Sequence, residues 1–289
     1  MALEERDQPS GYMTTGHEWN GIKELNSPVP RLVFFFLWLT FAIAVLGWVL
    51  MPAWPLGLTY TKGLLGMSQR KTLAASIQAA APEVASWTSR IKTLDYPALQ
   101  ADPSLMQAVR QTGHTLFADN CAACHGAQGK GQPGFPSLVA AAWLWGGDPA
   151  TIAQTLRVGI NSAHPESRTS QMLAFGKQGV LKKPEIESVA DYVRSLSHAG
   201  QDPTQVAGGQ AIFAANCVAC HGDDGKGNLE LGAPNLTDQI WLYGGEKASI
   251  VTTIDLGRQG HMPTWEGRLT EVQRKILALY VVDLGARQK

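Results

Sequence analysis

The stretch GHTLFADNCAACHGAQGKG (residues 113–131) decides the fold, because it returns as GQAIFAANCVACHGDDGKG (209–227) with twelve of nineteen positions identical. The similarity extends to two further pairs of segments, FPSLVAAAWLWGG (135–147) with APNLTDQIWLYGG (233–245) and PEIESVADYVRSL (184–196) with TEVQRKILALYVVDL (270–284). A repeat of this length indicates that two homologous domains follow one another along the chain.

Each repeat contains one C-x-x-C-H motif, and the four cysteines of the chain all lie in these two motifs. The spacing is the attachment signature of haem c: the two thiols bond to the haem vinyl groups, and the histidine that follows faces the iron. The motifs predict two covalently bound haems c, one on Cys121, Cys124 and His125 and the other on Cys217, Cys220 and His221.

Paired C-x-x-C motifs also occur in zinc sites and in thioredoxin-type redox centres. Zinc ribbons place their half-sites about 15–20 residues apart, whereas Cys121 and Cys217 are separated by 96 residues. A thioredoxin-type motif is expected beside a βαβ unit, and no pair of segments alternates strongly enough to predict strands. Haem attachment is therefore favoured over both alternatives.

The second axial ligand of each iron is expected from the loop before the final helix of its repeat, where class I cytochromes c use methionine. Met172, in SQMLAFG, is the only methionine that follows the first motif within its repeat, and Met262, in GHMPTW, is its counterpart in the second. We therefore predict that His125 and Met172 ligate the first haem iron. His221 and Met262 are predicted to ligate the second.

Other residues are expected to complete the pockets. They are Phe117 and Phe213 on the attachment helices, Trp143 and Trp241 along the pocket walls, and Pro136 and Pro234 as acceptors for the histidine N–H groups. An ordinary place in the core is an equal alternative for the four aromatic residues. His164 and His261 are the rival axial ligands, although a single histidine in a loop is usually just solvated. Irons with both axial positions filled have no site for a substrate, so electron transfer is expected rather than catalysis. The sequence contains no Ser/His/Asp set, paired carboxylates or phosphate-binding loop that indicates another chemistry.

The helical pattern predicts an all-α fold. In the closing segment of the first repeat, Ile186, Val189, Ala190 and Val193 recur with the spacing of one helix face. Asp102–Pro103 and Asp202–Pro203 each read as an N-cap followed by a first helical residue. We predict tandem class I cytochrome c domains over residues 102–198 and 199–289, with a hinge near 197–201.

The uncharged run from Leu32 to Met51 is long enough for a transmembrane helix, since twenty residues span about 30 Å. A buried helix is disfavoured because the run is apolar on every side, and a signal peptide because a long polar segment precedes it. The expected order is a polar, irregular tail (1–31), a membrane helix (32–52) and a connector (53–101). Within the connector a helix is predicted over 67–80, with breaks at Pro82 and Pro97.

Charge provides little further information about partners. Lys plus Arg and Asp plus Glu both total 24, so nothing indicates a nucleic-acid partner. Residues 103–197 carry eight basic and six acidic residues, whereas 200–289 carry eight basic and ten acidic ones. The more acidic second repeat is suited to attract a basic electron donor.

The segment GHEWNGIKELNSPVPR (16–31), directly before the apolar run, has no role in haem chemistry. With the order of the other parts, it resembles the dihaem subunit of cbb3-type cytochrome c oxidases, subunit III or the CcoP/FixP family, in its form with one membrane helix. The resemblance covers essentially the whole chain. It implies electron relay from a donor cytochrome c to a monohaem subunit and a haem–copper subunit, the latter being the chain that reduces O₂.

Haem c attachment in bacteria takes place outside the cytoplasmic membrane. We therefore expect a single-pass protein of the inner membrane, with both haem domains in the periplasm, the N-terminus in the cytoplasm, and lipid around the anchor. Two other functions remain open on the sequence: a free-standing membrane-anchored dihaem shuttle, and a dihaem peroxidase. The segment 16–31 disfavours the shuttle, and the two methionines disfavour the peroxidase.

Overall fold

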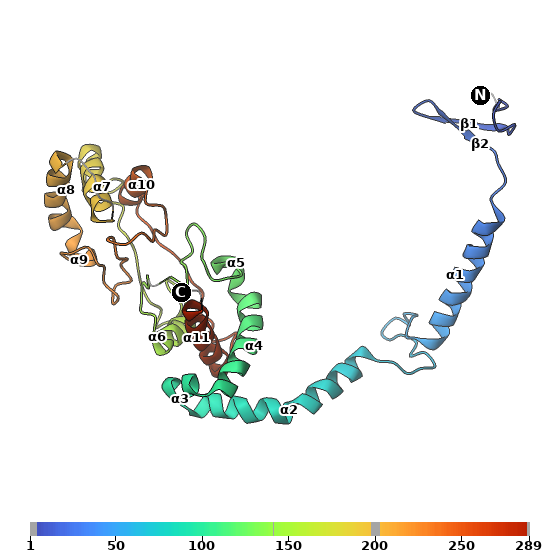
Figure 1. The fold of residues 1–289 in the computed structure, drawn as a ribbon, viewed down its shortest axis with the longest axis horizontal. Coiled ribbons are helices and arrows are strands. Elements are labelled where there is room, and N and C mark those ends of the chain that lie inside the picture. The colour runs from blue at the N-terminus through green and yellow to red at the C-terminus, as the bar shows by residue number, and fades with distance from the viewer. Residues whose placement is uncertain (1–4, 141, 198–202, 288–289) are drawn as a thin grey trace. The chain divides into compact units, whose positions relative to one another are not determined.

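The computed structural model describes residues 5–140, 142–197 and 203–287 (Figure 1). The chain divides into two units, residues 1–81 and 82–289. Helices dominate both, as predicted. One long helix, α2 (Gln69–Thr93), belongs to both units.

A β-hairpin precedes the apolar helix, where we predicted an irregular tail without strands. β1 (Thr14–Trp19) pairs antiparallel with β2 (Ile22–Leu25). The two residues between them, Asn20 and Gly21, have φ values of 51° and 87°. Positive φ at both central positions matches the right-handed twist of the paired strands, and Asn-Gly is the dipeptide that adopts it most readily. The prediction is therefore wrong for this segment, and Asn20–Gly21 was the sequence signal that could have corrected it.

Helix α1 (Arg31–Leu50) confirms the predicted apolar helix, and none of its residues is buried. Within the described residues it is the one helix long and apolar enough to cross a membrane. The chain that follows folds back onto its end: the N–H groups of Leu64 and Leu65 donate to the carbonyls of Val49 and Leu50, each at 3.0 Å. These bonds satisfy carbonyls that have no partner inside the helix.

The predicted break at Pro82 is wrong, because α2 continues through it to Thr93. A proline inside a helix deprives the carbonyl four residues earlier of its donor. That residue, Gln78, is exposed, so water can hydrate its carbonyl. Pro97 lies in the first turn of a helix, α3 (Tyr96–Ala101), whose N-cap Asp95 accepts a hydrogen bond from the N–H of Ala98.

The helices from residue 103 onward repeat the same order, as predicted. They are α4 (Pro103–Asn120), α5 (Ala122–His125), α6 (Pro149–Val158) and α7 (Lys183–Ser197), then α8 (Pro203–Asn216), α9 (Val218–His221), α10 (Lys247–Leu256) and α11 (Glu271–Ala286). Asp102 caps α4, accepting from the N–H groups of Ser104 and Leu105. The proposed cap Asp202 and most of the proposed hinge lie outside the described residues.

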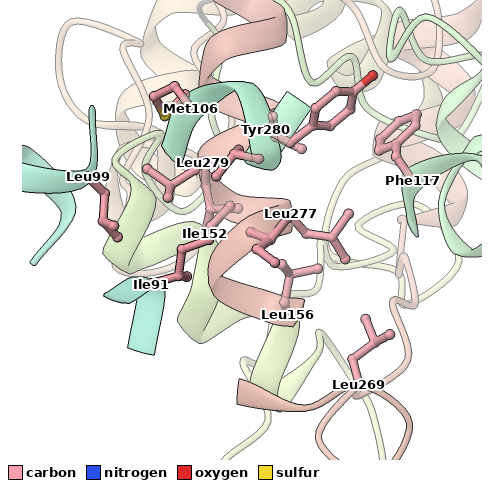
Figure 2. Close-up of a cluster of buried hydrophobic side chains, with 14 of the residues drawn as sticks. Ile91, Leu99, Met106, Phe117, Ile152, Leu156, Leu269, Leu277, Leu279 and Tyr280 are labelled. Atoms are coloured by element: carbon pink, nitrogen blue, oxygen red, sulfur yellow. The ribbon is translucent and has the colours of Figure 1, made fainter. Parts of the chain in front are cut away.

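The closing helix of each repeat packs into the core of the other repeat. Helix α11 packs on α4 and α6, and α7 packs on α8 and α10 (Figure 1). We call α4, α5, α6 and α11 the first lobe, and α7 to α10 the second lobe. The core of the first lobe brings Phe117 and Ile152 of the first repeat against Leu277 and Tyr280 of the second (Figure 2). The two lobes are therefore not the contiguous segments 102–198 and 199–289 that we predicted as domains.

A glycine lets the closing helix approach closely in each lobe. A Cβ on Gly113 of α4 would lie 2.6 Å from the Cβ of Tyr280, and one on Gly209 of α8 would lie 2.7 Å from the Cβ of Tyr192. Distances this short leave no room for a side chain. The same two tyrosines pack against aromatic rings of the attachment helices, at 5.8 Å between ring centroids in the first lobe and 5.2 Å in the second.

Candidate haem attachment sites

Each C-x-x-C-H motif forms a single helical turn at the end of a long helix. Cys121 ends α4, and its carbonyl accepts hydrogen bonds from the N–H groups of Cys124 and His125 at 3.1 and 2.9 Å. Cys217 follows α8 and makes the same two bonds, to Cys220 and His221, at the same distances. Both thiols and the imidazole of each motif therefore lie on one compact turn, as covalent haem attachment requires.

The histidine of each motif is oriented by a proline carbonyl, as predicted. Nδ1 of His125 lies 2.9 Å from the carbonyl oxygen of Pro136, and Nδ1 of His221 lies 3.1 Å from that of Pro234. The carbonyl can only accept, so Nδ1 carries the proton and Nε2 is left for the iron. Burial lowers the pKa of both histidines, against the opposing effect of these hydrogen bonds, and favours the neutral imidazole that binds metal.

The first cysteine of each motif is a poor thiolate in the haem-free chain. Burial, with a smaller effect of the neighbouring cysteine, raises the pKa of Cys121 to about 11 and that of Cys217 to about 11. Reactive redox cysteines have lowered pKa values instead. The two motifs also lie against different hydrophobic cores, so they do not form one four-cysteine site.

The two candidate axial methionines are packed in the opposite way to the predicted pairing. Met262 packs on the first core together with Cys121 and Trp143. Met172 packs on the second core together with Cys217 and Trp241. Each candidate axial methionine thus packs on the core that also holds the attachment turn of the other repeat.

Backbone hydrogen bonds fix this exchange. Met262 and Ile160 exchange N–H···O bonds in both directions at 2.9 Å, directly after α6. Met172 makes the equivalent pair with Arg258, directly after α10, at 2.8 and 3.0 Å. Glycine is required beside each pair, because a Cβ on Gly159 or Gly257 would lie 2.5 Å from the carbonyl oxygen of Met262 or Met172. The loop that carries each methionine is therefore bound to a helix end of the other repeat.

Two buried tryptophans carry donors that fit the polar edge of a haem. Among the described residues, the indole N–H groups of Trp145 and Trp241 are buried and have no hydrogen-bond partner. Such donors are costly unless an acceptor is bound. Carboxylate groups of a haem would supply acceptors. With two thiols, an imidazole and a thioether at each lobe, the side chains present fit haem c.

One feature of the site was not predicted from the sequence: an aromatic ring packed under an arginine in each repeat. The guanidinium carbon of Arg168 lies 4.9 Å from the ring centroid of Trp145, and that of Arg258 lies 4.5 Å from that of Tyr243. Trp145 also packs on Gly232 of the other repeat, where a Cβ would lie 2.4 Å from the ring. The matching positions of Trp145 and Tyr243 in the repeats were the available signal.

The alternative axial ligands lie elsewhere. His164 has both ring nitrogens engaged: Nδ1 accepts from the N–H of Glu166 at 3.0 Å, and Nε2 lies 2.8 Å from Glu266. His261 is exposed, directly before Met262. None of the contacts described for these two histidines directs a ring nitrogen toward an attachment turn.

Three family models match the chain: "N-terminal domain of cytochrome oxidase-cbb3, FixP" over residues 11–57, "Cytochrome c" over 111–197 and "Cytochrome C oxidase, cbb3-type, subunit III" over 204–281. The chain is 48% identical to a cbb3-type cytochrome c oxidase subunit FixP from Bradyrhizobium sp. (strain ORS 278), over 97% of each chain. It is 43% identical to a subunit CcoP from Azospirillum sp. (strain B510), over 99% of each. A CcoP from Cereibacter sphaeroides is 41% identical, over 97% of each.

Proposed function

The chain belongs to the FixP/CcoP family of cbb3-type cytochrome c oxidase subunits, and from this we propose that it relays electrons through two haems c to the other subunits of such an oxidase. Its cytochrome c domains and apolar N-terminal helix mark it as a membrane-anchored haem c protein. The observation that carries the proposal is that each attachment turn has a methionine packed on its own core.

We propose the following axial ligands. His125 and Met262 ligate the iron of the haem on Cys121 and Cys124. His221 and Met172 ligate the iron of the haem on Cys217 and Cys220. This pairing reverses the one predicted from the sequence, and the exchange of backbone hydrogen bonds described above supports it.

The proposed ligands determine what the sites can do. A haem c held in this way supplies a reversible one-electron couple, whose potential is raised by a thioether ligand. With an imidazole and a thioether of the protein as its ligands, either iron would have no open coordination position for peroxide or O₂. His125 and His221 are held by proline carbonyls and therefore keep their orientation when the charge on the iron changes. Oxygen reduction is assigned to another chain of the complex.

The partners follow from this role. We propose that electrons arrive from a donor cytochrome c and leave toward the monohaem and haem–copper subunits. Haem c attachment outside the cytoplasmic membrane places both lobes in the periplasm and the β-hairpin in the cytoplasm. α1 then crosses the lipid bilayer of the inner membrane.

The second attachment turn carries the charges that suit a basic donor. Between His221 and Pro234 the chain has three acidic residues and one lysine, whereas the matching loop between His125 and Pro136 has one lysine alone. The acidic residues are Asp223, Asp224 and Glu230, all exposed near the exposed Cys220, and two half-exposed leucines, Leu229 and Leu231, lie among them. An apolar patch ringed by acids suits a lysine-rich cytochrome.

The test is purification of the tagged full chain in mild detergent. We expect a haem–copper subunit to copurify, with cyanide-sensitive O₂ uptake and two covalently bound haems per chain. A chain that comes out alone, without O₂ uptake, contradicts the oxidase assignment. One haem per chain contradicts the dihaem assignment by itself.

A further inference from the structure

The strand that carries Met262 is held at its far end by charged side chains of the first repeat. This extended segment, residues 262–266, is called the Met262 strand below. It first forms a single β-bridge with Ile160 and then donates from the N–H of Trp265 to the carbonyl of Leu156 at 3.0 Å. The hydroxyl of Thr264 donates to the carbonyl of Arg157 at 2.5 Å. The last residue, Glu266, reaches two side chains of the first repeat, His164 and Arg157.

His164 is the buried member of this group. Its side chain is 10% exposed, against 46% for Glu266. Nδ1 accepts the N–H of Glu166, so the ring proton must be on Nε2, which donates to Glu266 at 2.8 Å. A buried imidazole with both nitrogens engaged has one orientation only. It therefore provides a fixed attachment point for the end of the strand.

Arg157 completes the group. It lies 3.5 Å from Glu266 and pairs more closely with Glu166. The two carboxylates come from different repeats, and the guanidinium between them reduces their repulsion. We call His164, Arg157, Glu166 and Glu266 the charged clamp.

Among the residues that the structure describes, the second lobe has no equivalent of the charged clamp. Its methionine strand makes the same backbone bonds, including the N–H of Phe175 to the carbonyl of Ile254 at 3.0 Å. At the positions that correspond to Arg157 and Glu266, however, it has Asp255 and Gly176. The side-chain clamp is thus a property of the first lobe alone.

We propose that His164, supported by Arg157 and Glu266, is a positioning residue that keeps the thioether of Met262 on the iron held by His125. The proposal rests on the axial pairing given under the proposed function. Only three residues separate Met262 from Glu266, so a fixed Glu266 limits how far the methionine can move from the turn. Without the clamp, the segment keeps its backbone bonds to Ile160 and Leu156 and the buried Trp265, but it loses the side-chain contacts that hold Glu266.

The test uses the purified, haem-loaded full chain and three variants. His164→Ala removes the fixed point, whereas His164→Gln keeps an N–H donor that can reach Glu266. Asp283→Asn is the matched control, because Asp283 forms an ion pair with Arg110 that joins the same two repeats in the same lobe without contacting the Met262 strand. The readouts are the methionine-to-iron charge-transfer band, the reduction potential and the binding of added imidazole to the oxidised haems.

We expect His164→Ala to tighten imidazole binding at one haem about tenfold, which is the scale on which supporting partners affect metal ligation. The same variant should weaken one methionine-to-iron charge-transfer band and lower the reduction potential of one haem. His164→Gln should restore most of the imidazole affinity, band intensity and potential of the unaltered chain, and Asp283→Asn should leave all three unchanged. Unchanged imidazole affinity in His164→Ala, or an equal change in Asp283→Asn, overturns the proposal. In a chain whose Cys121 and Cys124 are both changed to alanine, loss of the remaining band on Met262→Ala contradicts the axial pairing itself, so the two failures are distinguishable.

Discussion

Arg110, on α4, donates a forked set of hydrogen bonds to the carboxylate of Asp283, 173 residues further along on α11, at 3.0 to 3.2 Å. The equivalent positions in the second lobe are occupied by Val206 and Ser195. Arg110 would therefore find no carboxylate if α7 closed the first lobe. A second polar pair, Lys247 with the buried Asp191 at 2.6 Å, joins α10 to α7 in the second lobe. These two pairs favour the exchanged helices over the contiguous arrangement.

The helix exchange predicts which residues are energetically coupled. Gly113→Ala should destabilise the full chain by about 1–3 kcal/mol, because the new methyl group overlaps Tyr280. Its effect should be non-additive with Tyr280→Ala and additive with Tyr192→Ala, since additivity holds for residues without contact. Chemical unfolding followed by circular dichroism measures this. Coupling to Tyr192 in place of Tyr280 would contradict the exchange.

The axial pairing can be read in chains that carry one haem. With Cys121 and Cys124 both changed to alanine, only the second attachment turn can bind haem covalently. In that background Met172→Ala should abolish the remaining methionine-to-iron band, and Met262→Ala should leave it in place. Absorption near the red edge of the visible spectrum of the oxidised protein is the measurement. The opposite result would restore the pairing expected from the sequence.

Donor docking at the second turn predicts a charge effect. Changing Asp223 and Glu230 together to lysine should slow reduction of the complex by a lysine-rich cytochrome c about tenfold at low ionic strength and flatten its salt dependence. Turnover with a small reductant such as ascorbate and a phenylenediamine should not change. Stopped-flow reduction of the assembled oxidase gives the rates. Asp119→Lys, an exposed reversal on α4, is the control, and an equal effect there would refute docking at this turn.

Asp102 predicts a dependence of stability on acid. The hydroxyl of Ser104, then the N–H of Leu105 and the guanidinium of Arg90, hold the pKa of Asp102 well below its ordinary value of 3.8. Its stabilising effect is therefore complete above about pH 4 and is lost as the pH falls through the lowered pKa. Asp102→Asn keeps a hydrogen-bond acceptor without the charge. The thermal midpoint of this variant should be lower than that of the unaltered chain at pH 7, and the difference between the two midpoints should shrink toward pH 2. A difference that stays constant with pH would show that the charge of Asp102 is not its cause.

The local parts of the sites could be predicted from the sequence because each depends on a short segment. The C-x-x-C-H turns, the proline acceptors Pro136 and Pro234 and the buried Phe117 and Phe213 are confirmed in place. Helix α1 follows from one uninterrupted apolar run. The hairpin at Asn20–Gly21 was missed although its turn signal was present.

The exchange of closing helices could not be predicted, because the repeat makes the two closures nearly equivalent. Helices α7 and α11 carry tyrosines at matching positions, Tyr192 and Tyr280, and α8 and α4 carry matching glycines. Helix packing alone is therefore compatible with either partner. The choice rests on several pairs together, among them Arg110 with Asp283 and Lys247 with Asp191, which are distant in sequence and ambiguous until the helices are placed. The pairing of each candidate axial methionine with an attachment turn was ambiguous for the same reason, because each methionine lies in the loop before an exchanged helix.

The helix exchange also imposes an order on how the protein is made. The first attachment turn leaves the ribosome well before α11, the sixteen-residue helix that completes its core. The growing chain thus presents Cys121 and Cys124 on an open core until α11 arrives. Attachment of the first haem has that interval in which to occur, whereas a chain that ends early leaves the first lobe unclosed however complete its first repeat is.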